Sequence, residues 1–236
     1  MSVQVVLLVL GSYLVGSIPS AYLAMKWARG IDIRRVGTGN VGAANVLTIG
    51  PKWLAIPVTL ADISKGAVCV WAAQLLGLGS TQQVAAGLAA IIGHNWPIYL
   101  RFSGGRGVFS SLGVITVLSP PLGLYALVMP YLLFAPIKQV AFGVFLAYLS
   151  LPPLAWSLSG TLGITERLPV TLGLVLIALI GLVRRLLVPR TTLSRTIPLP
   201  NLIINRLLFD RDIADRATWI RQKAAQDEAD QEPSTS

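Results

Sequence analysis

Long apolar stretches separated by short polar ones are the main pattern along the chain. The apolar stretches cover residues 3–25, 53–77, 82–100, 138–159 and 168–188, with a longer one at 107–135. Because a helix needs about 20 apolar residues to cross the ~30 Å hydrocarbon core of a bilayer, most of these stretches have the length of a transmembrane helix. The pattern predicts an all-α polytopic membrane protein.

The stretch 107–135 is too long for one span. As a single helix it would reach about 45 Å at 1.5 Å per residue. It also contains Ser119, Pro120 and Pro121 in succession, and two prolines in mid-helix remove backbone hydrogen bonds and clash with the preceding turn. Two spans, 107–119 and 121–135, fit this break although each is short, and the choice between six and seven spans depends on charge: with six, either the Arg34 loop or the arginine-rich C-terminus would lie outside.

Basic residues decide the expected orientation, because Lys and Arg collect in cytoplasmic loops. Seven spans with the N-terminus outside leave only Arg167 on the outer side, beside Glu166. We expect this arrangement, with a cytoplasmic C-terminus. The basic residues then on the inner side are Lys26, Arg29, Arg34, Arg35, Lys52, Arg101, Arg106, Lys138 and the arginines from Arg184 onward.

The composition supports a membrane protein and changes the meaning of its charge. The chain of 236 residues is 54% hydrophobic and 12% charged, whereas soluble domains carry about 25% charged residues. We attribute the net charge of +9 to membrane orientation and to contact with anionic lipids, because nucleic-acid binding would need an exposed basic face on a soluble fold.

The first apolar stretch lacks a basic leader and a cleavage site, so we expect it to be retained rather than removed as a signal peptide. The single Cys69 is expected to pack in an apolar helix.

The chain becomes polar after residue 190, which suggests three regions. We expect a seven-helix membrane domain at 1–190 and a cytoplasmic basic segment at 191–223. The latter mixes large apolar residues with spaced arginines, as an amphipathic helix on the inner leaflet would. The polar residues 224–236 are typical of a disordered tail.

Two glycine-rich polar loops fall on the expected cytoplasmic side. They are DIRRVGTGNVGAAN at 32–45 and GHNWPIYLRFSGGRGV at 93–108. Glycines let backbone N–H groups approach a ligand, and arginines hold oxyanions through two parallel hydrogen bonds. Irregular backbone at membrane depth persists only where protein covers it or water reaches it. The two loops therefore predict one anion-binding pocket at the inner interface, although each alone could be a simple turn.

Asp62 and Lys65 place two charges inside the expected span 53–77. They are three residues apart and so share one face of a helix. Ionisable side chains within a span usually mark a functional site, but a structural ion pair between helices explains them equally well. His94, the only histidine, likewise fits either a functional group or a hydrogen bond between helices.

Four segments, in order and spacing, resemble the bacterial acyl-phosphate:glycerol-3-phosphate acyltransferases of the PlsY type. They are GSIPSAYL (16–23), DIRRVGTGNVGAAN (32–45), DISKG (62–66) and GHNWPIYLRFSGGRGV (93–108). The resemblance implies seven membrane helices with the active site at the cytoplasmic face. It also implies transfer of a fatty acyl group from acyl phosphate to the 1-hydroxyl of glycerol 3-phosphate, giving lysophosphatidic acid and phosphate for phospholipid synthesis. No cofactor, metal or nucleic acid is implied; the implied partners are the two substrates and membrane lipids.

The matching positions give a set of expected site residues. The resemblance implies that Thr38, Asp62 and His94 are catalytic, with Thr38 in place of a family serine. Arg106 stands where the family has lysine, and Ser103 replaces another lysine. The expected substrate-binding residues are Arg34, Gly39, Asn40, Gly42, Asn45, Lys65, Ser103, Gly104, Gly105, Arg106 and Gly107.

The chain departs from the family pattern on the side expected to hold the acceptor. Thr48 stands where the family has arginine, and Ala141 where it has serine. The C-terminal motif survives only as INRLL at 204–208. Two alternatives therefore stay open: an acyltransferase with another acceptor, and a non-catalytic lipid-binding homologue. Arg184, Arg185, Arg195 and Arg206 are candidates to replace the lost groups.

Overall fold

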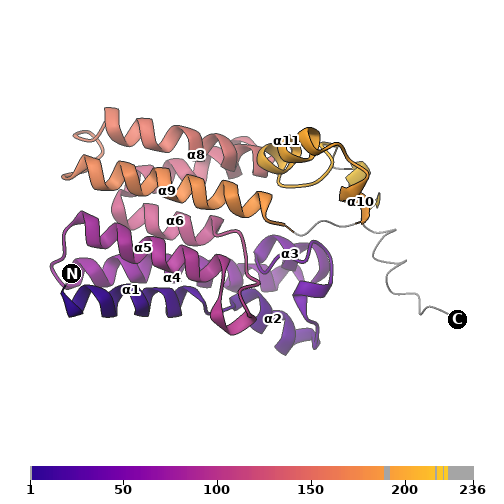
Figure 1. Cartoon of the computed structure of the whole chain (residues 1–236), viewed down its shortest axis with the longest axis horizontal. Helices are drawn as coiled ribbons and strands as arrows, with labels where there is room; N and C mark the ends of the chain where they lie inside the picture. The colour runs from indigo at the N-terminus through magenta and orange to yellow at the C-terminus, as the bar shows by residue number, and fades with distance from the viewer. Residues whose placement is uncertain (1, 189–191, 216, 220, 223–236) are drawn as a thin grey trace, which may run out of the picture.

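The computed structural model is an all-helical bundle and describes residues 2–188, 192–215, 217–219 and 221–222 (Figure 1). The long helices of the bundle lie side by side along its length. Consecutive helices run in alternate directions, because the end of one and the start of the next meet at the same end of the bundle. These helices are α1 (Val3–Gly16), α4 (Ala55–Leu75), α5 (Ser80–Asn95), α6 (Val108–Leu118), α7 (Pro120–Val128), α8 (Val140–Ser157) and α9 (Arg167–Leu186).

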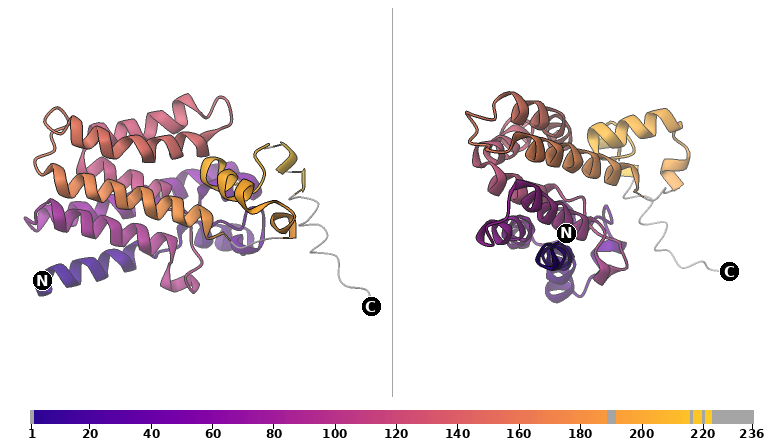
Figure 2. Two further views of the ribbon diagram at one scale, coloured as in Figure 1. Left: turned by 45° about the horizontal axis from the view of Figure 1, so that its top comes forward. Right: turned by 60° about the vertical axis from the view of Figure 1, so that its left-hand side comes forward.

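Short helices and loops gather at the end of the bundle away from the N-terminus, which we call the loop end (Figures 1 and 2). The α-helices there are α2 (Ser20–Arg29), α3 (Ala43–Ile49), α10 (Thr192–Arg195) and α11 (Leu199–Phe209). Three short turns of 3-10 helix belong to the connections at this end: η1 (Ile33–Arg35) between α2 and α3, η2 (Lys52–Leu54) between α3 and α4, and η3 (Ile98–Leu100) between α5 and α6. Both glycine-rich loops of the sequence therefore lie at one end of the molecule.

Among the described residues, four helical segments are long and apolar enough to cross a membrane: Val3–Arg29, Lys52–Leu75, Val140–Ser157 and Arg167–Leu186. The stretch 107–135 is divided as expected: Ser119 lies between α6 and α7 in extended backbone (φ −156°, ψ 103°). Pro120 begins α7, where a missing N–H does no harm. After α7 the chain continues as a π-helical turn, η4 (Met129–Leu133).

The first apolar stretch is interrupted, which differs from the expected continuous helix at 3–25. Helix α1 ends at Gly16, and α2 begins only at Ser20. Pro19 has no N–H to continue the helix, and its φ of −90° and ψ of 72° lie outside helical values. The break leaves the Ile18 carbonyl free to accept a hydrogen bond from Lys65 Nζ at 3.2 Å.

Glycines let the helices pack closely, as is common in membrane bundles. A side-chain carbon on Gly16 of α1 would lie 2.1 Å from the Ala90 carbonyl oxygen of α5. One on Gly66 of α4 would lie equally close, 2.1 Å, to the Ser110 carbonyl oxygen of α6. Cys69 is buried and unpaired, with its Sγ 3.8 Å from the Ser12 carbonyl oxygen, so its packing role is confirmed.

The segment after α9 folds back onto the bundle. Helix α11 packs on α8 and α9, with Leu202 and Arg206 buried. Arg185 of α9 donates a hydrogen bond to the Leu207 carbonyl oxygen, and Arg211 donates to the Gln139 side chain at 3.1 Å. The expected disordered tail, 224–236, lies outside the described residues.

Candidate active site

A cavity of about 240 Å³ opens at the loop end and contains most of the expected catalytic residues. We call it the central cavity. Eight segments contribute to it, far apart in the sequence: residues 38–44, α4, α5, residues 106–109, the π-helical turn η4, the start of α8, the end of α9 and the chain after α11. Its polar lining consists of Thr38, Asn40, Gly42, Asp62, His94, Arg106, Gly107, Arg185 and Asp210.

The loop at 36–45 is shaped by one buried amide. Asn45 accepts a hydrogen bond from the Thr38 N–H at 3.0 Å and donates to the carbonyl oxygens of Ile33 and Val36, each at 3.1 Å. Gly37 has a φ of 60°, and any side chain there would strike Asn45. Asn45 thus lies behind the loop and holds its shape, while Thr38 and Asn40 face the cavity.

Asp62 joins three elements at the inner end of the cavity. Its Oδ1 accepts a hydrogen bond from Ser20 at 2.5 Å and lies 2.7 Å from Lys65 Nζ. His94 Nδ1 lies 3.5 Å from the same oxygen. All three charged or titratable side chains are less than a tenth exposed. Lys65 itself is outside the central cavity and fastens Asp62 to the break between α1 and α2.

The second glycine-rich loop passes directly over His94. A side-chain carbon on Gly105 would lie 2.0 Å from His94 Nε2, and the Gly105 N–H donates to the His94 carbonyl oxygen at 3.0 Å. Gly107 has a φ of 72° and precedes the first turn of α6. The glycines therefore allow the loop to fold tightly against α5 and bring Arg106 to the cavity wall.

Arg106 is mostly buried, with 18% of its side chain exposed. It forms an ion pair with Asp210, from the chain after α11, and also donates to the Asp210 carbonyl oxygen at 3.3 Å. Burial lowers the pKa of Arg106 to about 9, and the guanidinium groups of Arg185, Arg184 and Arg206 act in the same direction. The charged side chains that line the cavity, Arg106 and Arg185 against Asp62 and Asp210, balance one another, and the guanidinium groups of Arg184 and Arg206 lie close enough to act on Arg106.

One wall of the central cavity is apolar. It is formed by Val108, Phe109, Tyr131, Val140, Ala141 and Val144. The rings of Phe109 and Tyr131 are stacked, with centroids 5.6 Å apart. Ala141 lies where the resemblance implies a serine, so this position does reach the cavity but brings no hydroxyl. A phosphate and a hydrocarbon chain could both find complementary surfaces here.

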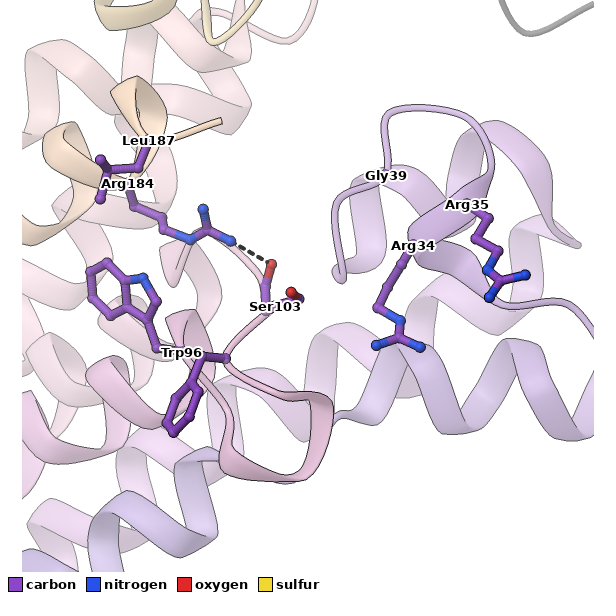
Figure 3. Close-up of a pocket in the computed structure, with 9 residues that line it drawn as sticks. Arg34, Arg35, Gly39, Trp96, Ser103, Arg184 and Leu187 are labelled. Atoms are coloured by element: carbon purple, nitrogen blue, oxygen red, sulfur yellow. Dashed lines mark hydrogen bonds between the residues drawn. The ribbon is translucent and has the colours of Figure 1, made fainter. Parts of the chain in front are cut away.

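A separate groove of about 670 Å³ lies on the other side of the two loops. Figure 3 shows this arginine groove, with Arg34 and Arg35 on one wall and Arg184 and Ser103 on the other. Arg184 donates to the carbonyl oxygens of Gly104 and Gly105, each at 3.0 Å. The remaining lining residues are Gly39, Trp96, Phe102, Gly104 and Leu187.

The charge in the arginine groove is partly balanced. Arg34 pairs with Asp32 through two hydrogen bonds, at 3.0 Å and 2.7 Å. These hydrogen bonds lower the pKa of Asp32 and raise that of Arg34. Arg35 is exposed. Among the residues that line the groove, Arg35 and Arg184 therefore carry most of the positive charge that no carboxylate balances.

A third, smaller space of about 60 Å³ adjoins the central cavity, and we call it the rear cavity. Thr38, Arg106, Arg185 and Asp210 border both spaces. The rear cavity is otherwise bordered by Val188, Arg206, Arg211, Asp212 and Trp219. Arg206 pairs with Asp212 at 2.7 Å and also donates to the carbonyl oxygens of Leu186 and Val188, at 3.1 Å and 2.6 Å, which holds α11 and the chain after it against the end of α9.

The single pocket expected from the sequence is therefore divided. The structure brings Thr38, Asn40, Gly42, Asp62, His94, Arg106 and Gly107 together at the central cavity. It places Arg34, Gly39, Ser103 and Gly104 in the arginine groove, and Asn45, Lys65 and Gly105 in supporting positions.

Two polar side chains that line the central cavity, Tyr131 and Asp210, were not among the residues predicted from the sequence. Tyr131 lies in an apolar stretch where nothing in the sequence sets it apart from its neighbours. Asp210 lies in the segment that was predicted to be an amphipathic helix on the membrane surface. Arg185, a candidate from its charge alone, does border the cavity. Thr48, where the family has arginine, is exposed on α3 and bonds only the Ala44 carbonyl oxygen.

No cluster of three or more potential metal ligands occurs among the described histidine, cysteine, aspartate and glutamate residues. The arrangement instead combines backbone N–H groups, buried guanidinium groups and an apolar wall. It can bind a phosphate ester that carries a hydrocarbon chain and stabilise negative charge that develops beside it.

Comparison with known proteins gives a consistent result. A family model described as glycerol-3-phosphate acyltransferase matches residues 6–188. Glycerol-3-phosphate acyltransferase 4 of Dehalococcoides mccartyi strain CBDB1 is 45% identical over 225 residues, which cover 95% of this chain and 97% of that protein. Glycerol-3-phosphate acyltransferase 5 from a second strain of the species is 44% identical over 225 residues, covering 95% and 96% of the two chains.

Two solved structures are similar in fold. Both are crystal structures of PlsY, an integral membrane glycerol 3-phosphate acyltransferase. The lysophosphatidic acid form has a TM-score of 0.67 at 28% identity, covering 77% of this chain and 88% of that one. The glycerol 3-phosphate form has a TM-score of 0.66 at 28% identity, covering 83% and 100% of the two chains.

Proposed function

The chain belongs to the glycerol-3-phosphate acyltransferase family, and from this premise we propose that it acylates the 1-hydroxyl of glycerol 3-phosphate with acyl phosphate as the donor. The products are lysophosphatidic acid and inorganic phosphate. The observation that carries the proposal is the central cavity, where an arginine-bearing glycine loop faces an apolar wall.

The donor fits this cavity in two parts. Its phosphate lies against Arg106 and the polar side chains of Thr38 and Asn40, where the buried guanidinium favours an anion. Its acyl chain follows the apolar wall at Phe109 and Val144 toward the bilayer. The acyl carbonyl then lies between these two regions, within the same cavity as His94 and Asp62.

The reaction needs no covalent intermediate on the protein, because acyl phosphate is already activated. The acceptor oxygen attacks the acyl carbonyl carbon, the bond from that carbon to the phosphate oxygen breaks, and the hydroxyl proton passes to the released phosphate. The protein contributes by holding both substrates in position and by stabilising the negative charge on the carbonyl oxygen. Thr38 supports the loop, since its Oγ1 accepts a hydrogen bond from the Asn40 N–H at 3.3 Å.

The same proposal includes the placement of the chain in its membrane. We place seven helical passes, α1 to α9 without α2 and α3, across a bacterial cytoplasmic membrane, with α7 and η4 forming one pass. The N-terminus is outside and the loop end is cytoplasmic. Basic residues support this orientation, because Lys26, Arg35 and Arg184 all lie at the loop end. Residues 191–223 then form a cytoplasmic segment.

Product analysis with reconstituted protein tests the function. Purified protein in lipid vesicles is supplied with labelled glycerol 3-phosphate and either palmitoyl phosphate or palmitoyl-CoA. We expect labelled lysophosphatidic acid with palmitoyl phosphate and only background with palmitoyl-CoA. Donor binding without any acylated glycerol 3-phosphate would point to another acceptor, and a protein that binds neither substrate would contradict the proposal.

A further inference from the structure

Asp210 occupies an unusual position at the end of α11. The helix ends at Phe209, and Asp210 follows in the left-handed conformation, with φ 58° and ψ 36°. Its N–H still donates to the Arg206 carbonyl oxygen at 3.1 Å. Aspartate and asparagine tolerate this conformation better than most residues. The turn brings the side chain to the boundary between the central cavity and the rear cavity.

The two oxygens of the Asp210 carboxylate have different surroundings. Oδ2 is paired with Arg106. Oδ1 is buried and has no hydrogen-bond partner among the described residues. Leaving a buried carboxylate oxygen unbonded is unfavourable, and such an oxygen can only accept a hydrogen bond. The position therefore calls for a donor that enters the cavity, and a hydroxyl group is suitable.

The surroundings also suit an anion close to that hydroxyl. Guanidinium groups of Arg106 and Arg185 border the same space. Because Arg106 is the residue assigned to the donor phosphate, the acceptor phosphate is placed against Arg185, which borders both cavities. A small molecule with a phosphate at one end and hydroxyl groups beside it would satisfy both kinds of group at once.

We propose that Asp210 Oδ1 accepts a hydrogen bond from the 2-hydroxyl of the acceptor, so that the chain after α11 forms part of the acceptor site. This inference rests on the proposed function and names a residue that recognises its acceptor. It also places a polar group in the cavity that Ala141 lines without a hydroxyl. The 2-hydroxyl does not react; its contact selects the acceptor and positions the neighbouring 1-hydroxyl.

The test compares two acceptors in three proteins. Glycerol 3-phosphate carries the 2-hydroxyl, whereas 3-hydroxypropyl phosphate keeps the reacting hydroxyl and the phosphate but lacks it. The proteins are the wild type, Asp210→Asn and Asp215→Asn. Asparagine accepts the left-handed backbone of residue 210, and Asp215 is an exposed aspartate of the same segment that bonds the Thr218 N–H at 2.7 Å, outside both cavities.

In the wild type and in Asp215→Asn, we expect kcat/KM to be about tenfold or more higher for glycerol 3-phosphate than for 3-hydroxypropyl phosphate. This is the effect expected when the second acceptor cannot form one hydrogen bond to a charged group. Asp210→Asn should reduce this preference to about twofold or less by raising the KM for glycerol 3-phosphate, with little change in the KM for palmitoyl phosphate. A general loss of structure would instead lower the rates with both acceptors equally, and a thermal unfolding curve for each protein separates that case.

Three results would overturn the inference. The first is an unchanged preference in Asp210→Asn, and the second is an equal loss of preference in Asp215→Asn. The third is a lower KM for palmitoyl phosphate in Asp210→Asn together with the wild-type preference between the two acceptors. That result would mean that the Asp210 carboxylate competes with the donor phosphate for Arg106 and does not contact the acceptor. If the wild type acylated neither acceptor, the proposed function itself would fail, which is a distinct outcome.

Discussion

Asp62 shows how single residues hold this site together. One carboxylate oxygen contacts Ser20, Lys65 and His94, which come from α2, α4 and α5. All of these groups are buried or nearly so, and a buried charge is stable only when its partners are present. The two readings that the sequence leaves open, function or helix pairing, are therefore compatible: the ion pair fixes the helices and thereby places His94 at the cavity.

Replacing Asp62 with asparagine should destabilise the protein strongly. The change leaves Lys65 buried without its counter-ion, and breaking such a pair typically costs about 3–5 kcal/mol. Thermal unfolding in detergent measures the effect. Asp32→Asn is the matched control, because its pair with Arg34 is partly exposed and should contribute about 1 kcal/mol or less. Equal losses in the two variants would contradict the role given to Asp62.

Arg106 is the residue through which the site is expected to hold the donor phosphate. Arg106→Ala should raise the KM for palmitoyl phosphate roughly tenfold or more, since a hydrogen bond to a charged group contributes about 1.5–3 kcal/mol. Arg106→Lys, which keeps a charge at this position, should recover much of the affinity. If both variants bind the donor as the wild type does, the loop acts through its backbone alone.

At the scale of the elements, helix packing explains which parts of the fold were predictable. The pattern of apolar residues predicts the helices well, and the prolines at 120 and 121 correctly indicate the division into α6 and α7. The break at Pro19 was missed because the apolar stretch continues through it. How closely helices approach depends on glycines that face a neighbouring backbone, and a single sequence does not show which glycines those are.

Gly16 and Gly11 of α1 offer a direct comparison of that effect. A side-chain carbon on Gly16 would lie 2.1 Å from the Ala90 carbonyl oxygen, whereas one on Gly11 meets nothing within 4 Å. Gly16→Ala should therefore destabilise the protein by about 1–3 kcal/mol through overpacking against α5. Gly11→Ala should be neutral or stabilising, because alanine favours helices by about 1 kcal/mol. If the unfolding midpoints fall equally in both variants, α1 does not approach α5 closely at Gly16.

On the scale of the whole molecule, the loop end gathers charge from segments far apart in the sequence. The motifs at 32–45 and 93–108 correctly indicate two loops near each other, but the split into a central cavity and an arginine groove depends on how the loops cross. Arg34 and Ser103 thus fall in a groove that no motif distinguishes from the central cavity. Asp210 was not predictable, because only the turn after α11 brings this aspartate to the site.

The arginine groove should guide the anionic acceptor toward the loop end. Arg35→Glu reverses an exposed charge on its wall and should raise the KM for glycerol 3-phosphate on the order of threefold at low ionic strength, with kcat unchanged. The difference should shrink as salt approaches about 0.5 M, where exposed charges are screened. Arg29→Glu, the same change at an exposed arginine that does not line the groove, should have a smaller effect. If the KM for glycerol 3-phosphate depends on salt in the same way in both variants, the net charge of the protein, and not the arginine groove, attracts the acceptor.

The most direct test of the account is the initial rate of phosphate release from palmitoyl phosphate by the wild-type protein in lipid vesicles, measured with and without glycerol 3-phosphate. If the central cavity catalyses acyl transfer, release should depend on glycerol 3-phosphate, and each phosphate released should be matched by one lysophosphatidic acid formed. Release at the same rate without the acceptor, or with no lysophosphatidic acid, would contradict the account.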